Sequence, residues 1–324
     1  MLTNTRLRLL ALGATALLGG TALTWQKHER HSRGLVLRPD NDSLVDAART
    51  LNRSAGLLAL AVASDSAVEH YRGDFRNRAM YTPLAVSSLQ LLAGAHGVRD
   101  HLPHAHRLRD GVAVGAILTG LTGTAFHLYN VTKRPGGLGW SNLFYAAPLG
   151  APTALLLSGV LGLYAERLRD ASQHVVPRVF GLPAGRAVAL MTAAGLLGTA
   201  AEAALLHFRG AFQNPSMYLP VTATPCTAGL LAACALSRRD HPRLRWWSRL
   251  GLRFTTLMGL VGSAFHTLGV ARNHGGWRNW RQNLQVGPPL PAPSGFTGLS
   301  LAGLAAHTLI EQHRELAHYR WWDR

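Results

Sequence analysis

The chain has 324 residues, of which 48% are hydrophobic and only 15% are charged, with a formal net charge of +17. In a soluble protein such a charge would point to nucleic acid, but here the arginines lie in short segments between apolar runs. This pattern favours membrane topology and anionic lipid headgroups, so we expect a lipid bilayer and no nucleic acid as partner. Soluble-enzyme motifs such as a P-loop, GxSxG or HExxH are absent from the sequence, which leaves open whether the chain is an enzyme.

Apolar runs of about 20 residues, the length of a helix that crosses a bilayer, recur along the chain. We expect nine such helices, at 6–24, 54–71, 80–98, 110–131, 142–164, 186–208, 216–236, 251–271 and 290–310. All eight tryptophans lie at the ends of these runs or between them, as is typical of indoles at a membrane interface. The sequence therefore predicts an all-α integral membrane protein with about nine spans.

The two ends of the chain differ from the rest. Arg6 and Arg8 accompany the first run, so residues 1–25 resemble a signal-anchor-like helix, and whether this segment is cleaved stays open. Residues 26–50 are polar and predict a linker without a span, while residues 314–324 predict a polar and aromatic tail.

Between these ends the chain repeats itself. The stretch HYRGDFRNRAMYTP from His70 recurs as HFRGAFQNPSMYLP from His207. Likewise GLTGTAFH, which ends at His127, recurs as GLVGSAFH, which ends at His266. Such self-similarity indicates a duplicated supersecondary unit.

The spacing of the repeat drifts along the chain. It is 137 residues at the first pair of stretches, 139 at the second, and 141 between Asn142 and Asn283. We therefore expect two tandem four-helix transmembrane repeats, residues 51–165 and 186–313. Because each has an even number of spans, both enter the membrane in the same direction and are parallel repeats.

Parallel repeats bring the four repeated histidines to one end of the molecule, which we call the histidine face. Its members are His70, His127, His207 and His266. Loops on this side, with the N-terminus, carry 11 of the 33 lysines and arginines, and the opposite side carries 22. The positive-inside rule then makes the histidine face periplasmic in a bacterial inner membrane, although an ordinary signal anchor at 6–24 would predict the reverse.

The histidines predict haem. Ionisable groups in or near a bilayer are usually functional, and haem iron in membrane helices takes imidazole ligands from two helices of a bundle. Arg72 and Arg209, two residues beyond a histidine, would bind the propionates. Glycines that share a helix face with a histidine would leave a flat groove for the porphyrin, or would only let a neighbouring helix pack closely. These glycines are Gly120, Gly123, Gly259 and Gly262.

Acids form a second group of candidates. Asp65 and Glu202 each precede a repeated histidine by five residues and lie deeper in the span. They predict proton uptake or quinone hydrogen bonding, or alternatively hydrogen bonds between helices. Further candidates for these roles are Asn77, Asn214, Tyr81 and Tyr218. The two cysteines, Cys226 and Cys234, are about 12 Å apart if helical, which excludes a disulfide, and we expect no metal other than haem iron.

Three functions stay open at this stage. The first is a membrane electron-transfer subunit that binds b-type haem, exchanges electrons with quinone and docks a redox partner protein on the histidine face. The second is a transporter or channel built from two parallel repeats, with the two acids in its path. The third is a non-catalytic membrane scaffold subunit.

Overall fold

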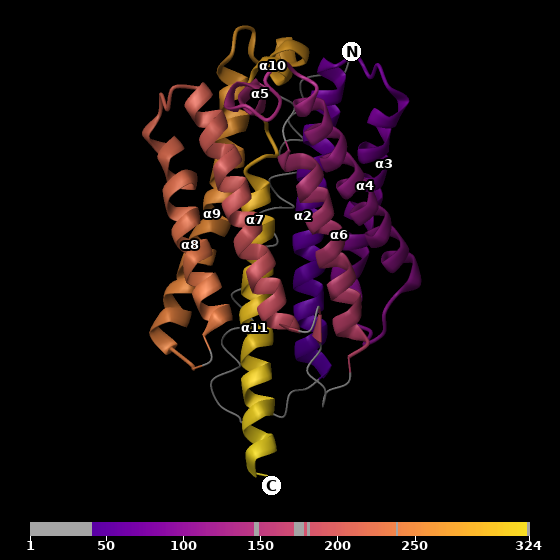
Figure 1. Ribbon diagram of the computed structural model, residues 1–324, viewed down its shortest axis with the longest axis vertical. Helices are drawn as coiled ribbons and strands as arrows, with labels where there is room; N and C mark the ends of the chain where they lie inside the picture. The colour runs from indigo at the N-terminus through magenta and orange to yellow at the C-terminus, as the bar shows by residue number, and fades with distance from the viewer. Residues whose placement is uncertain (1–40, 146–148, 172–177, 180–181, 238, 323–324) are drawn as a thin grey trace.

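The computed structural model describes residues 41–322 apart from 146–148, 172–177, 180–181 and 238. The helix expected at 6–24 lies outside the described residues. Eight long helices make up most of the described chain (Figure 1): α2 (Asn41–Arg72), α3 (Thr82–Arg99), α4 (Arg107–Thr132), α6 (Gly150–Arg169), α7 (Ala184–Arg209), α8 (Leu219–Leu236), α9 (Pro242–Arg272) and α11 (Ser294–Trp322).

Short elements connect them. The connections contain 3-10 helices η1 (Arg78–Tyr81), η2 (Pro215–Tyr218) and η3 (Gly276–Asn279), and the short helices α5 (Trp140–Tyr145) and α10 (Trp280–Val286). Between α6 and α7, β1 (Arg178–Val179) pairs antiparallel with β2 (Leu182–Pro183). Each of these two strands has two residues, so the described fold is all-helical in substance, as predicted.

The long helices form two halves, which we call the first half (α2 to α6) and the second half (α7 to α11). In each half the first long helix packs against the second and the fourth, and the third packs against the fourth. Helices α2 and α11 join the halves, with α7 beside α6 as a smaller contact. Figure 1 shows α2, α6, α7 and α11 in the middle, α3 and α4 at one side, and α8 and α9 at the other.

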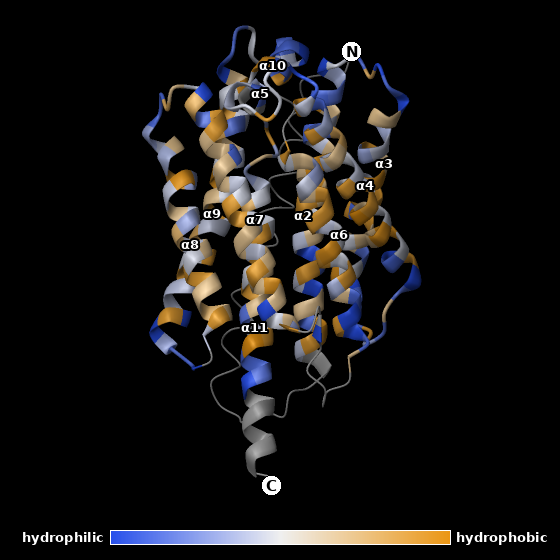
Figure 2. Cartoon of the chain, viewed as in Figure 1, coloured by the Kyte–Doolittle hydropathy of each residue, from blue (hydrophilic) through white to orange (hydrophobic). Residues whose placement is uncertain are grey.

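Burial follows this arrangement. The main core takes leucines from all four middle helices, for example Leu51, Leu161, Leu196 and Leu299, each at most 2% exposed. The outer helices instead carry large apolar side chains on their outer surface. Leu92, Leu118 and Leu257 are 65%, 59% and 58% exposed. Figure 2 shows hydrophilic residues concentrated at the two ends of the bundle and apolar residues along its middle.

Such an outer surface is expected where the solvent is lipid. Four helical segments are long and apolar enough to cross a membrane: α4, α7, α9 and residues 215–236, which comprise η2 and α8. This finding indicates a membrane protein. The count of nine spans is not reached within the described residues, because α2, α3, α6 and α11 do not meet the same combination of hydropathy and low charge.

Three helix boundaries differ from the expected ones. Helix α2 begins at Asn41, so residues 41–50 belong to the helix and not to the linker. Helix α11 continues to Trp322, so most of the expected tail is helical. Asn142 does not open a long helix: it lies in α5, and α6 begins at Gly150.

Candidate functional site: the histidine face

All four repeated histidines lie near the C-terminal ends of long helices, and all are partly buried. His70 and His207 are in the last turns of α2 and α7, and His127 and His266 lie one to two turns from the ends of α4 and α9. His127 lies within electrostatic range of His70, and His207 lies within range of His266. The first and third long helices of each half therefore bring two imidazoles near one another.

Three of the imidazoles make the same type of contact with the main chain. His70 Nδ1 lies 2.7 Å from the carbonyl oxygen of Met80, and His207 Nδ1 lies 2.8 Å from that of Met217. His266 Nδ1 lies 2.6 Å from the carbonyl oxygen of Pro289. A carbonyl oxygen can only accept a hydrogen bond, so Nδ1 must carry the proton in each case. In the neutral ring Nε2 then keeps its lone pair, which is the arrangement of a metal-ligating histidine.

A strained turn holds the loop that follows His70. Asp74 and Phe75 have φ angles of 55° and 46°, a left-handed conformation that side chains with a Cβ rarely adopt. The turn places the Phe75 ring edge-on to His70, with centroids 6.1 Å apart, and stacked on Tyr81 at 4.4 Å. Strain of this kind is often found at functional sites.

The second half has the same turn. Ala211 and Phe212 have φ angles of 55° and 45°. The Phe212 ring lies 6.0 Å from that of His207, edge-on, and 4.6 Å from that of Tyr218, stacked. Sequence reasoning missed both phenylalanines, although Phe75 and Phe212 stand at equivalent places in the repeated stretches.

The asparagine candidates have local structural roles. Asn77 Oδ1 accepts from the Ala79 N–H at 2.9 Å, and Asn214 Oδ1 accepts from the Ser216 N–H at 3.0 Å. Each is thus the N-cap of a 3-10 helix. Tyr81 and Tyr218 lie at the same end of the bundle and are 54% and 52% exposed.

The arginine candidates are engaged by neighbouring side chains. Arg72 forms an ion pair with Glu69, one turn earlier on α2. The Arg209 guanidinium lies over the Tyr145 ring, 5.7 Å from its centroid. A matching contact that the sequence did not predict joins Arg281 Nε to the Tyr71 hydroxyl at 2.6 Å. Both arginine–tyrosine contacts run between the two halves.

The glycine faces are covered by the next helix. A Cβ on Gly120 would lie 2.7 Å from the Pro152 carbonyl oxygen and 2.8 Å from Leu156 Cα, both on α6. On Gly259 it would lie 2.6 Å from the Pro293 carbonyl oxygen. Gly123 and Gly262 face the same two prolines, whose Cβ atoms lie 3.1 and 2.9 Å from the positions of their missing Cβ atoms. These glycines let α4 and α9 pack closely on their partners.

Asp65 and Glu202 lie within electrostatic range of one another although they belong to different halves. The Glu202 carboxylate accepts a hydrogen bond from the Gly150 N–H, at the first residue of α6. Gly150 cannot be replaced without a shift, because a Cβ there would overlap that carboxylate. One acid from each half therefore acts electrostatically on the other, and Glu202 also neutralises part of a helix N-terminus.

At the opposite end of the first half lies a buried ion cluster that sequence reasoning did not single out. Arg109 binds both carboxylate oxygens of Glu166, at 2.8 and 2.9 Å, and Asp100 at 2.7 Å. Arg169 donates to the carbonyl oxygens of Gly97, Asp100 and Leu102. Burial raises the pKa of Asp100, but the Leu102 N–H and the Arg109 guanidinium outweigh it and hold the pKa below its ordinary value.

Within the described residues, no group of three or more histidine, cysteine, aspartate or glutamate side chains could hold a metal ion. A haem iron needs only two imidazoles from such side chains, because the porphyrin supplies its other ligands. Comparison of the chain with known protein families, with curated proteins and with solved structures finds no match.

Proposed function

We propose that the chain is a membrane electron-transfer subunit that binds b-type haem through the histidine pairs His70–His127 and His207–His266. The observation that carries this proposal is the set of Nδ1–H hydrogen bonds to carbonyl oxygens at three of the four histidines. Each bond fixes the ring orientation and the tautomer, and it leaves Nε2 as the free ligand atom. Haem iron, when bound, would supply one-electron redox chemistry.

The histidine surroundings support this assignment. The acceptor is a main-chain carbonyl oxygen, whose position does not depend on a side-chain rotamer. This fixed partner favours one orientation of each imidazole ring. Arg72 and Arg209 remain the proposed propionate donors because they follow the histidines at the end of the bundle. The glycines Gly120, Gly123, Gly259 and Gly262 are left out of the proposed site, because α6 covers the first two, and Pro293 with the start of α11 covers the other two.

Quinone is the proposed electron partner within the membrane. The reduction of quinone consumes protons. Asp65 and Glu202 are acids that lie within apolar stretches of α2 and α7. Intramembrane acids near a redox centre are suited to hold and release such protons. Tyr81 and Tyr218, both exposed residues, carry hydroxyl groups that can donate hydrogen bonds at the histidine face. On this proposal that face is periplasmic and docks a soluble redox partner.

A reduced-minus-oxidised visible spectrum of the full chain, expressed with ample haem supply, tests the proposal. We expect a haem absorbance band, about half of which disappears in His127→Ala and about half in His266→Ala. His101→Ala is the matched control, since His101 lies in the loop at the opposite end. A wild-type spectrum without a haem band, or loss of equal size in the control, would remove the proposal.

A transporter is the second candidate, and one observation favours it. Asp65 and Glu202 interact electrostatically although they belong to different halves, and the path of a transporter built from two repeats would run between those halves. Proton flux into proteoliposomes that contain the purified chain measures this activity. We expect flux that Glu202→Gln abolishes if transport is the function, and no flux above that of empty liposomes if the haem proposal holds.

A further inference from the structure

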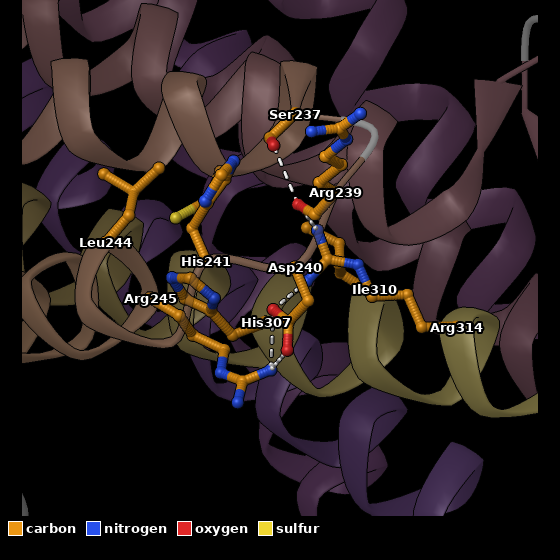
Figure 3. A pocket seen from close by; sticks show the side chains of 10 residues that line it. Ser237, Arg239, Asp240, His241, Leu244, Arg245, His307, Ile310 and Arg314 are labelled. Atoms are coloured by element: carbon orange, nitrogen blue, oxygen red, sulfur yellow. Dashed lines mark hydrogen bonds and ion pairs between the residues drawn. The ribbon is translucent and has the colours of Figure 1, made fainter.

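A small recess, with a cavity volume of only about 10 Å³, lies at the end of the second half opposite the histidine face. It is formed by the end of α8, the turn that follows, the start of α9 and one side of α11. Its polar lining includes Arg239, Asp240, His241, Arg245 and Arg314. Figure 3 shows the Asp240 carboxylate between the guanidinium groups of Arg245 and Arg314.

The arginines in the recess and directly next to it outnumber the carboxylates they bind. Asp240 binds Arg245 at 3.1 Å and Arg314 at 2.6 Å. Glu311 binds Arg245 at 3.1 Å and Arg249 at 2.6 Å. Two carboxylates thus serve three guanidinium groups, and the guanidinium of Arg239 adds a fourth that has no ion-pair partner within the described chain. The surplus is two positive charges, which favours an anion.

The corresponding place in the first half is closed. By the repeat spacings of 139 and 141, Ser248 and His307 stand where Arg109 and Glu166 stand in the first half. Arg109 and Glu166 fill their site with a buried ion pair. Ser248 Oγ and His307 Nε2 are joined only by one hydrogen bond of 2.9 Å, and this smaller pair leaves the recess above it lined by His307.

Exposed apolar and aromatic side chains lie on the ends of α8 and α9 that form the recess. Leu236 directly precedes its lining residue Ser237 in sequence and is 67% exposed. Trp246 and Trp247 directly follow Arg245 and are 57% and 54% exposed, with their rings edge-on at 4.6 Å. Exposed indoles beside arginines at a helix end are typical of the membrane interface, where lipid headgroups lie.

We propose that the arginines at the mouth of this recess bind the phosphate group of an anionic phospholipid, with Arg239 and Arg314 as the principal contacts. Guanidinium groups match phosphate oxygens in charge and in geometry. The exposed side chains of Leu236, Trp246 and Trp247, at the same end of the bundle, would contact the upper part of the acyl chains. This inference rests on the membrane placement of the chain and does not depend on haem.

Native mass spectrometry of the full chain in a mild detergent, with phosphatidylglycerol or phosphatidylcholine added in turn, tests the inference. We expect preferential retention of phosphatidylglycerol. Arg239→Gln should weaken it on the order of five-fold, since one arginine near an anionic surface contributes about that much. The Arg239 side chain forms no ion pair within the described chain, so this variant should fold. Arg239→Gln combined with Arg314→Gln should abolish the preference.

Arg167→Gln is the matched control. It removes the same charge at the same end of the molecule, from a side chain that is 53% exposed and pairs with Asp110 in the first half. Equal retention of both lipids by wild type, or an equal loss in Arg167→Gln and Arg239→Gln, overturns the inference. So does displacement of the lipid by millimolar inorganic phosphate, which would make free phosphate the ligand. The haem spectrum of Arg239→Gln should match wild type, so failure here and failure of the haem proposal are distinguishable.

Discussion

The imidazole of His70 and the carbonyl oxygen of Met80 are joined by a hydrogen bond of 2.7 Å, which ties the end of α2 to η1. His207 and Met217 are joined in the same way at 2.8 Å in the second half. In each case the intervening turn contains two residues with positive φ that are not glycine. Such a turn costs free energy, on the order of 1 to 3 kcal/mol for each residue, and the imidazole contact helps to hold it closed.

We therefore predict that His70→Ala opens this turn and leaves the other one intact. Hydrogen–deuterium exchange should become faster for amides in 73–81 and remain unchanged in 210–218. His207→Ala should give the opposite result and so serves as the matched control. Equal acceleration of both segments in His70→Ala would show that the two turns are not independent, and no acceleration would show that the imidazole does not hold the turn.

Two glycines on α4 give a sharp test of helix packing. A Cβ at Gly120 would meet the backbone of α6, whereas a Cβ at Gly115 would meet nothing within 4 Å. Gly120→Ala should lower the free energy of unfolding by about 1 to 3 kcal/mol through overpacking. Gly115→Ala should raise it by about 0.5 to 1 kcal/mol, because alanine loses less backbone entropy than glycine in a helix. Unfolding midpoints in a denaturing detergent titration would measure both.

The two outcomes also decide what the glycine pattern means. If Gly120→Ala is as stable as Gly115→Ala, the close packing of α4 on α6 is wrong, and the glycine face becomes available to a flat ligand again. The sequence could not decide this point, because a glycine face suits a porphyrin and a neighbouring helix equally well. The positions of Pro152 and Leu156 across from Gly120 decide it, and they depend on how the two helices cross.

Glu166 and Arg167 are neighbours in sequence with opposite surroundings. Glu166 is fully buried and binds Arg109, while Arg167 is 53% exposed and binds Asp110. Glu166→Gln should destabilise the chain by about 3 to 5 kcal/mol, because it leaves Arg109 in an interior site without its main counter-ion. Arg167→Gln should cost less than about 1 kcal/mol, as is usual for exposed ion pairs. Thermal unfolding of both variants would measure the difference, and equal costs would contradict the burial of Glu166.

The helical fold could be predicted from the sequence, whereas the start of α2 could not. The all-helical fold and its apolar outer surface follow from the length and composition of the runs. The start of α2 did not, because Asp46, Arg49 and other polar residues precede Leu51. In the helix these charged side chains are partly exposed, while Ala47, Ala48 and Leu51 are buried. This first part of α2 is amphipathic, with an apolar face and a charged face, so a search for continuous apolar runs does not detect it.

The candidate site shows the same limit. The four histidines could be found from the repeat, but the partner of His266 could not. That partner is the carbonyl oxygen of Pro289, 23 residues further along the chain, and only the path of the connection between α10 and α11 brings it to the ring. Every residue has a main-chain carbonyl oxygen, so no sequence motif can predict which of them will accept this hydrogen bond.

Asp100 gives a prediction for pH. Its pKa is held below the ordinary value by the Leu102 N–H and Arg109, which outweigh the effect of burial. A carboxyl with a lowered folded-state pKa stabilises the fold above its unfolded pKa of about 4 and loses that contribution as pH falls further. Wild type should therefore unfold at a higher temperature than Asp100→Asn at pH 6, and the gap should shrink from pH 4 towards pH 2.5. A gap that is constant over this range would show that the Asp100 charge contributes nothing.

The last prediction concerns orientation. The histidine face and the C-terminal side lie at opposite ends of the bundle. If the N-terminal segment is counted with the histidine face, the C-terminal side carries 22 of the 33 lysines and arginines. Basic residues in short loops are retained in the cytoplasm, so a fluorescent protein fused after Arg324 should be fluorescent and an alkaline phosphatase there inactive. A phosphatase inserted after Gly137, in the connection on the histidine face, should be active and serves as the matched fusion. Phosphatase activity at the C-terminus with none at Gly137 would reverse the orientation and move the proposed lipid recess to the outer leaflet. Activity at both sites would contradict the placement of these two segments on opposite sides of a membrane.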